Sequence, residues 1–238
     1  MRDYTSDRSV AVLQGLSGPN PSCGSATCVE LNDRWFLATA AHNIDYITND
    51  ADIRLVPRAE RGHPGIPFLR RSHPRSSEHE LDVAWIELDP VTGRRGGLLA
   101  VPQDQLRPAT DYGAYFIQGY PSGEVEQDAS GGFDPLSLCV FVMSLQAEPS
   151  GDLPLVYPPN SPADVGLQLI HPRGFSGGGV WTFKGLEVWP YVNIEKEALA
   201  GIITGYEASL RRLNSVSITG WLDLVAMDNP DLGELLAI

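Results

Sequence analysis

The sequence predicts an all-β protein that ends in a single helix. Its 238 residues include 24 glycines and 19 prolines, so turns are frequent and long uninterrupted helices are disfavoured. Short apolar segments alternate with turn residues along most of the chain, and an amphipathic helical pattern occurs only near its end. A chain of this length can bury a sizeable core, either as one large domain or as two packed halves.

Ten segments are expected to form strands, because each is short, rich in apolar residues and bounded by turn residues. In order along the chain they are residues 10–13, 27–31, 35–39, 53–57, 83–88, 115–119, 138–144, 166–170, 179–182 and 200–204. After the last of them, apolar residues recur at spacings of three and four, which is the pattern of an amphipathic helix. Its apolar stripe consists of Ile218, Trp221, Leu222, Leu224, Val225 and Met227.

Three stretches have the composition that is typical of linkers and loops. Residues 92–111 are rich in Gly, Pro and charge, and we expect them to link two β halves. Residues 124–135 are polar and Gly-rich, and residues 148–162 hold five prolines. We expect both of these stretches to form long surface loops.

The charge balance excludes two classes of partner. There are 17 basic and 30 acidic residues, which gives a net charge of −13. An acidic surface repels the phosphates of nucleic acids and the anionic headgroups of membranes. No stretch approaches the roughly 18 apolar residues of a transmembrane helix. We therefore expect neither a nucleic-acid partner nor a membrane partner.

The cysteines and the first residues predict a cytoplasmic protein. Cys23, Cys28 and Cys139 are odd in number, with neither metal-ligand spacing nor a disulfide framework. Residues 10–13 form the only apolar run before Gln14, too short for the core of a signal peptide. A mature secreted chain that has lost its leader would fit the same residues.

A serine between glycines is the first candidate for chemistry. It lies in the segment Gly174-Phe175-Ser176-Gly177-Gly178, where a sharp turn can expose the hydroxyl group and aim backbone N–H groups at one point. Such clusters are more often ordinary loops. The segment also fits the Gly-x-Ser-x-Gly elbow of α/β-hydrolases, but that family needs a histidine after the serine. All five histidines precede it: His42, His63, His73, His79 and His171.

Two further segments supply a base and an acid. The apolar residues 35–41 end in small side chains before His42, and small side chains allow a neighbouring loop to approach a base closely. Asp82 opens the alternating segment 83–88. Taken alone, His42 would more often be a hydrogen-bonded core histidine, and Asp82 would more often end a turn or a strand.

Together, the three segments resemble the motifs of the trypsin-like, chymotrypsin-fold serine peptidases: Thr-Ala-Ala-His, Asp-Ile-Ala-Leu-Leu and Gly-Asp-Ser-Gly-Gly. Here they stand as Thr39-Ala40-Ala41-His42, Asp82-Val83-Ala84-Trp85-Ile86 and Gly174-Phe175-Ser176-Gly177-Gly178, with intervals of 40 and 94 residues between the three central residues. The resemblance covers most of the chain. It continues in Gly24-Ser25-Ala26-Thr27, Gly119-Tyr120-Pro121, Gly201-Ile202-Ile203-Thr204 and residues 216–221.

The resemblance implies a fold of two packed six-stranded β-barrels followed by a C-terminal helix. The first barrel, residues 1–105, would carry His42 and Asp82. The second, residues 106–238, would carry Ser176 and end in the helix.

The resemblance also implies an activity, that of a serine endopeptidase acting on a protein or peptide through an acyl-enzyme. Ser176 would attack the peptide carbonyl, His42 would move the proton, and Asp82 would orient the imidazole. The backbone N–H groups of Gly174 and Ser176 would form the oxyanion hole. No metal and no organic cofactor would be required.

The chain departs from the family's pattern in two places. Phe175 stands where zymogen members carry an Asp that pairs with a freed N-terminal amine. Asn43 stands where a cysteine usually follows the histidine, so Cys23, close to the position of that cysteine's partner, is expected to be a free thiol. Both departures favour a bacterial, non-zymogen type that does not depend on disulfides.

The residues around the expected substrate pocket allow a partial prediction of which P1 residues the enzyme accepts. Six residues before the serine, where trypsin has an acid, the chain has Ile170, which disfavours a basic P1 residue. His171 and Arg173 would favour an acidic P1 residue, although a structural histidine and a solvated arginine are equally compatible readings. Thr204 and Tyr206 would also border the pocket, and Tyr206 would narrow its mouth.

Two alternatives to a constitutive peptidase remain open. An effector peptidase that a protein partner switches on could use the loops at 124–135 and 148–162. A catalytically silent binding module on the same fold would have no physical need for His42, Asp82 and Ser176 together.

Overall fold

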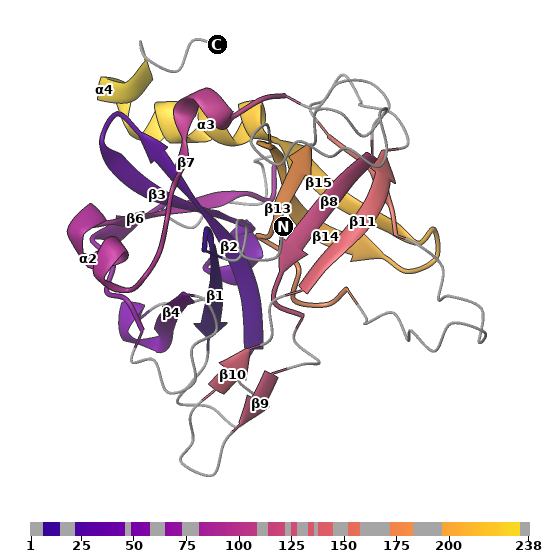
Figure 1. The fold of residues 1–238 in the computed structure, drawn as a ribbon, viewed down its shortest axis with the longest axis horizontal. Coiled ribbons are helices and arrows are strands. Elements are labelled where there is room, and N and C mark those ends of the chain that lie inside the picture. The colour runs from indigo at the N-terminus through magenta and orange to yellow at the C-terminus, as the bar shows by residue number, and fades with distance from the viewer. Residues whose placement is uncertain are drawn as a thin grey trace.

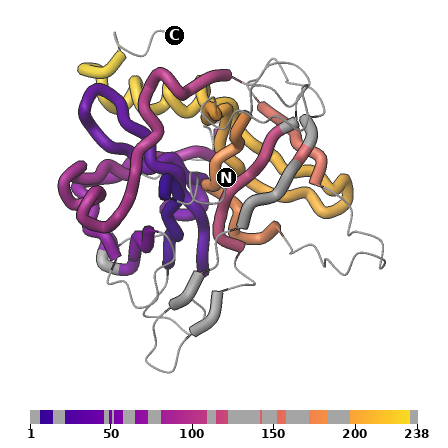
Figure 2. Tube along the Cα trace, in the orientation of Figure 1, coloured from indigo at the N-terminus to yellow at the C-terminus, as the bar shows by residue number. Residues whose placement is uncertain are grey.

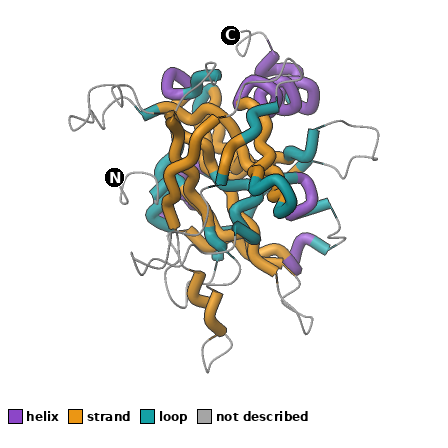
Figure 3. The backbone as a smooth tube through the Cα atoms, turned by 90° about the vertical axis from the view of Figure 1, so that its right-hand side faces the viewer, coloured by secondary structure: helices purple, strands orange, loops and turns teal. Residues whose placement is uncertain are grey.

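The computed structural model describes residues 7–14, 22–45, 49–57, 65–72, 81–108, 114–121, 125–127, 133–135, 138–144, 152–157, 172–182 and 197–233. Its strands form two larger sheets and one small hairpin, and its helices lie at the periphery (Figures 1 and 3). The N-terminal and C-terminal halves of the chain lie side by side (Figure 2). The protein is thus mostly β with a C-terminal helix, as the sequence predicts.

The strands are β1 (Ser9–Gln14), β2 (Ser22–Leu31), β3 (Arg34–Thr39), β4 (Ile53–Pro57), β5 (Arg70–Arg71), β6 (Ala84–Leu88), β7 (Val101–Pro102), β8 (Ala114–Gly119), β9 (Val125–Gln127), β10 (Phe133–Pro135), β11 (Leu138–Ser144), β12 (Leu155–Val156), β13 (Gly179–Thr182), β14 (Ala198–Glu207) and β15 (Arg212–Ser217). The helices are α2 (Pro90–Arg95), α3 (Ile218–Asp228) and α4 (Pro230–Gly233), with 3₁₀ turns η1 (Ala41–Asn43), η2 (Asp50–Asp52) and η3 (Gln103–Gln105). None of the helices in the described ranges is long and apolar enough to span a bilayer.

The first sheet has the order β4-β1-β2-β3-β6-β5, and β7 pairs with β2 in parallel. Within the described residues this sheet is curled and has seven strands, against the six that the sequence predicts for the first barrel. Most residues of its five longer strands, β1, β2, β3, β4 and β6, are buried. In β1, Val10 and Val12 pack inside the sheet, and Ala11 and Leu13 pack against Tyr120 from the other half of the chain.

The second sheet is a closed barrel with the order β11-β12-β15-β14-β13-β8. Here six strands form the barrel that the sequence predicts. Alternating residues on neighbouring strands fill its interior, because successive side chains of a strand point to opposite faces. Examples are Tyr115, Ile117, Val180, Ile203 and Leu213.

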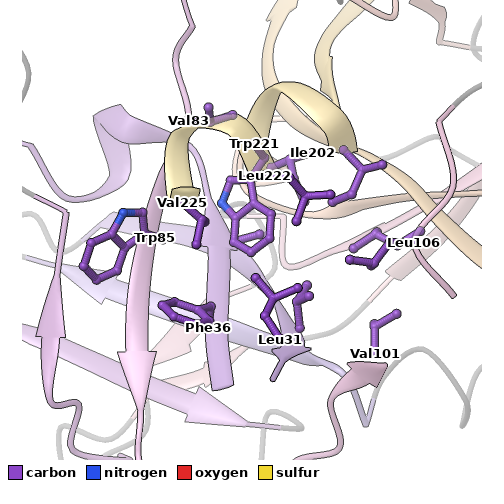
Figure 4. Packing of buried hydrophobic residues seen from close by; sticks show 14 of the residues in the cluster. Leu31, Phe36, Val83, Trp85, Val101, Leu106, Ile202, Trp221, Leu222 and Val225 are labelled. Atoms are coloured by element: carbon purple, nitrogen blue, oxygen red, sulfur yellow. The ribbon is translucent and has the colours of Figure 1, made fainter. Parts of the chain in front are cut away.

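The two sheets share one apolar core, which α3 covers (Figure 4). In the first sheet the rings of Phe36 and Trp85 meet edge-on, with their centroids 5.8 Å apart. In the barrel the rings of Phe116 and Trp181 stack, with their centroids 5.9 Å apart. From α3, Trp221 fills the space between them and donates a hydrogen bond from its indole N–H to the Ala84 carbonyl at 2.9 Å. The core therefore fixes the two sheets relative to each other.

The predicted helical stripe is confirmed except at one position. Ile218, Trp221, Leu222, Leu224 and Val225 are buried. Met227 is 67% exposed, because it lies in the last turn of the helix, beyond the face that meets the core.

Residues 92–106 follow β6 of the first sheet and precede β8 of the barrel, and they contain the end of α2, β7 and η3 rather than an irregular segment. Asp89 caps α2 by accepting a hydrogen bond from the Thr92 N–H at 2.9 Å, and a proline follows the cap at the first helical position. Gly93 lets α2 pack on Trp35, since a Cβ at this glycine would lie 2.7 Å from the indole. Gly93 suggests a flexible segment in the sequence, but in the structure it allows α2 to pack closely against Trp35.

The two predicted surface loops contain paired strands. Residues 124–135 include β9 and β10, which pair with each other. Residues 148–162 include β12, which completes the closed barrel between β11 and β15. The predicted strand at 166–170 lies outside the described residues.

Candidate active site

The sheet register places His42 next to Asp82. His42 lies in η1, directly after β3, and Asp82 lies two residues before β6. These two strands are antiparallel neighbours with Thr39 opposite Ala84, so the end of one meets the beginning of the other. The Ala41 N–H donates to the Asp82 carbonyl at 3.2 Å and fixes the two segments together.

Asp82 binds His42 through both carboxylate oxygens. One lies 2.6 Å from the ring Nδ1 of His42, and the other accepts the backbone N–H of His42 at 3.0 Å. An ionised carboxylate only accepts, so a neutral ring in this contact carries its proton on Nδ1 and has a lone pair on Nε2. The two side chains are 41% and 42% exposed, which leaves them open to a substrate.

Ser176 sits in a tight turn that requires glycines. Gly174 and Gly177 have φ angles of +98° and +87°, in the left-handed region that favours glycine. A Cβ on Gly177 would lie 1.8 Å from the Ser25 carbonyl oxygen. The turn is closed by the Gly178 N–H, which donates to the Phe175 carbonyl at 2.7 Å.

The serine turn packs against the segment that carries His42. The Ser176 carbonyl accepts hydrogen bonds from the Ser25 N–H and from the Asn43 side-chain amide, each at 2.8 Å. Asn43 is the residue after His42. Ser176 itself is half-buried, whereas its neighbour Phe175 is fully buried in the barrel interior. The structure thus brings together the three segments that the sequence singles out.

The structure describes three of the five residues that are expected around the substrate pocket. The N–H of Gly177 donates to the Ile203 carbonyl at 2.6 Å, so β14 runs beside the serine turn and places Thr204 next to it. Both Thr204 and Tyr206 are half-buried, and Arg173 is exposed. Ile170 and His171 lie outside the described residues.

Tyr157 is a neighbour of this strand that the sequence does not reveal. Its ring meets Tyr206 edge-on with centroids 5.8 Å apart. Burial raises the pKa of Tyr157 to about 12, with a smaller effect of Tyr206, so its hydroxyl group stays neutral. Tyr157 falls in a proline-rich stretch that reads as a loop, which is why no sequence pattern marks it.

The cysteines near the site are free thiols. Cys23 and Cys28 are both buried and form no disulfide. Burial raises the pKa of Cys23 to about 12, so this thiol is unreactive at neutral pH. Across the described ranges, no three His, Cys, Asp or Glu side chains are grouped so that they could hold a metal ion.

No family model matches the chain, and no curated protein matches it in sequence. Two of the solved structures that it resembles come from Sesbania mosaic virus. One is from work on the aromatic interactions that drive coupled folding and binding of the intrinsically disordered VPg protein; it has a TM-score of 0.55 at 14% identity over 89% of this chain and 86% of that one. The other is the serine protease domain of the viral polyprotein, with a TM-score of 0.54 at 13% identity over 89% of this chain and 88% of that domain. The chain therefore has the two-sheet fold of a chymotrypsin-like serine protease domain.

Proposed function

We propose that the chain is a serine endopeptidase that works through Ser176, His42 and Asp82. One observation carries the proposal: Asp82 binds both the ring and the backbone of His42, and the next residue, Asn43, holds the serine turn. The shared fold with a viral serine protease domain supports it. In the proposed domain division, residues 1–105 supply His42 and Asp82, and residues 106–238 supply Ser176.

In the proposed reaction, Nε2 of His42 takes the hydroxyl proton of Ser176 while Oγ bonds to the substrate carbonyl carbon. The C=O π electrons move to the oxygen and form a tetrahedral oxyanion. Asp82 stabilises the imidazolium without taking its proton. When the oxyanion collapses, the C–N bond breaks and the amine leaves with the proton from His42. Water then repeats the sequence on the acyl-enzyme, which releases the acid and restores Ser176.

The N–H groups of Gly174 and Ser176 are the proposed donors to the oxyanion. The positive φ of Gly174 supports this role, because a left-handed residue at this position turns successive N–H groups toward one side of the chain. Loss of one such donor in a related site lowers kcat by about 10²–10³.

The proposed substrate is a protein or peptide with a non-basic P1 residue, because Ile170 stands where trypsin carries an acid. Because Phe175 is buried in the barrel and offers no carboxylate, we infer a non-zymogen enzyme. Its proposed compartment is the cytoplasm. Activation by a protein partner is the second candidate, and the similar structure from work on the VPg protein supports a protein partner for this fold.

Labelling with a fluorophosphonate probe tests the function directly. The expected results are covalent labelling of the full chain and a loss of peptide hydrolysis of about 10⁶-fold in Ser176→Ala, because the proposed nucleophile is removed. Ser209→Ala is the matched control, since this serine is exposed in a hairpin and bonds only locally to Glu207. Hydrolysis by Ser176→Ala within tenfold of the unmodified chain would remove Ser176 from the mechanism.

A further inference from the structure

A buried hydrogen-bond network joins the turn that carries His42 to the turn that carries Ser176. Its centre is the Asn43 side chain, which is only 4% exposed. The Asn43 amide nitrogen donates to the Ser176 carbonyl at 2.8 Å and to the Thr39 hydroxyl at 3.0 Å. The same nitrogen also lies 3.4 Å from the Ser25 carbonyl, so one amide group joins three segments that are separate in the sequence.

Ser25 is the second member of the network. Its N–H shares the Ser176 carbonyl with Asn43, and its hydroxyl donates to the Gly174 carbonyl at 2.8 Å while accepting the Tyr120 N–H at 2.8 Å. The Ser25 carbonyl in turn accepts the Thr39 hydroxyl at 2.7 Å. The carbonyl groups of Gly174 and Ser176, on either side of Phe175, are thus held from the first sheet.

Two glycines provide the space for this network. A Cβ on Gly24 would lie 2.4 Å from the Asn43 side-chain oxygen. A Cβ on Gly177 would lie 2.4 Å from the Thr39 hydroxyl. Because the Ser176 carbonyl only accepts hydrogen bonds, the amide turns its NH₂ toward Ser176.

We infer that Asn43 is a positioning residue for the reaction proposed above, and the inference rests on that proposed function. Because Asn43 is buried, we assign it no direct contact with substrate. By holding the Ser176 carbonyl, it fixes the hydroxyl and the N–H of Ser176 relative to the imidazole of His42, its own chain neighbour. Catalysis is sensitive to such placement, since a shift of about 1 Å can lower the rate about 10²-fold.

The test compares two Asn43 variants with a matched control. Asn43→Asp keeps the shape but turns an oxygen instead of an N–H group toward the Ser176 carbonyl, and Asn43→Ala removes the group. The control is Asn229→Ala, because Asn229 is as buried, at 1% exposed, and its amide also donates to a backbone carbonyl, that of Val225 at 2.9 Å.

Four quantities are measured for each variant: kcat, KM, the melting temperature and amide hydrogen exchange of residues 172–180. For both Asn43 variants we expect kcat to fall about 10²-fold with KM little changed, and exchange in residues 172–180 to become faster. For Asn229→Ala we expect a lower melting temperature with kcat and exchange at 172–180 unchanged. A purely structural role for Asn43 would make the two positions behave alike.

Several outcomes overturn the inference. Retention of kcat in the Asn43 variants would do so, as would an equal loss of kcat in Asn229→Ala. If Asn43→Asp does not fold, Ser25→Ala replaces it, since this change removes a single hydroxyl from the same network. If the unmodified chain hydrolyses no peptide, the proposed function is contradicted, but the effect of Asn43 on the serine turn can still be tested by hydrogen exchange. Unchanged exchange at 172–180 in Asn43→Ala then still overturns the positioning role, and faster exchange confined to that variant supports it.

Discussion

Two buried glutamates experience opposite environments in this protein. Burial alone would raise the pKa of Glu87, but hydrogen bonds from Arg34 and Arg70 outweigh burial and lower it. Glu197 is 2% exposed, and both of its carboxylate oxygens lack a hydrogen-bond partner among the described residues. Burial raises the pKa of Glu197 to about 7, against the opposing charge of Arg8. A carboxylate at Glu197 therefore destabilises the fold at neutral pH.

Glu197→Gln is expected to stabilise the protein in a pH-dependent way. The folded pKa of Glu197 lies above its unfolded value, so folding is most favoured at low pH, where both states are protonated. The stability is lost as pH rises from about 4.5 to about 7 and stays low above that range. Glutamine keeps the neutral shape at every pH. The melting temperature of the variant should exceed that of the unmodified chain at pH 8 and equal it at pH 4. An equal difference at both pH values would contradict the assignment.

At the scale of elements, α3 connects the barrel to the strand that follows Asp82. The Trp221 indole donates to the Ala84 carbonyl, and the Trp85 indole donates to the Asp228 carboxylate at 2.8 Å at the end of the helix. Consecutive residues of β6 are thus held by the two ends of α3. The helix therefore anchors the beginning of β6.

Trp221→Phe should lower the free energy of unfolding by about 1–3 kcal/mol, because the buried Ala84 carbonyl loses its indole donor. Chemical denaturation monitored by circular dichroism measures the change. Met227→Ala in the same helix is the control, and its exposed side chain predicts a change within about 0.5 kcal/mol. Equal effects of the two substitutions would show that the hydrogen bond from Trp221 to Ala84 does not contribute to the free energy of unfolding.

Element boundaries were predictable where a periodic apolar pattern exists. Strand β2 begins at Ser22 rather than at residue 27, because small residues that show no pattern of their own pair with β1. Strands β5 and β12 have two residues each, too few for any period to be visible. Helix α2 did carry a signal, the cap at Asp89 followed by proline, but the glycine-rich composition around it suggested a linker.

At the scale of the whole molecule, the sequence reveals the parts of the candidate site but not how they are held. The segments of His42, Asp82 and Ser176 each have a recognisable local pattern. The contact of Asn43 with the Ser176 carbonyl spans 133 residues of sequence and exists only because the first sheet and the barrel pack together. A local pattern cannot encode such a contact, which is why the roles of Ser25 and Asn43 needed the structure.

The shared core predicts that both halves unfold in one transition. Phe36 and Trp85 come from the first sheet and Phe116 and Trp181 from the barrel, and all four belong to the same buried cluster with α3. Because neither half can expose its side of this cluster without cost to the other, unfolding should be cooperative.

Phe116→Ala tests this coupling, since the ring is fully buried and stacks on Trp181. We expect a loss of about 3–5 kcal/mol, the usual cost of removing a buried aromatic ring. Far-ultraviolet circular dichroism, tryptophan fluorescence and probe labelling of Ser176 should lose their native signals at one shared, lowered temperature. Tryptophans lie in both halves of the cluster, so the fluorescence reports on both sheets. If the halves were independent, the barrel would melt first, and labelling would disappear while part of the tryptophan fluorescence stayed native.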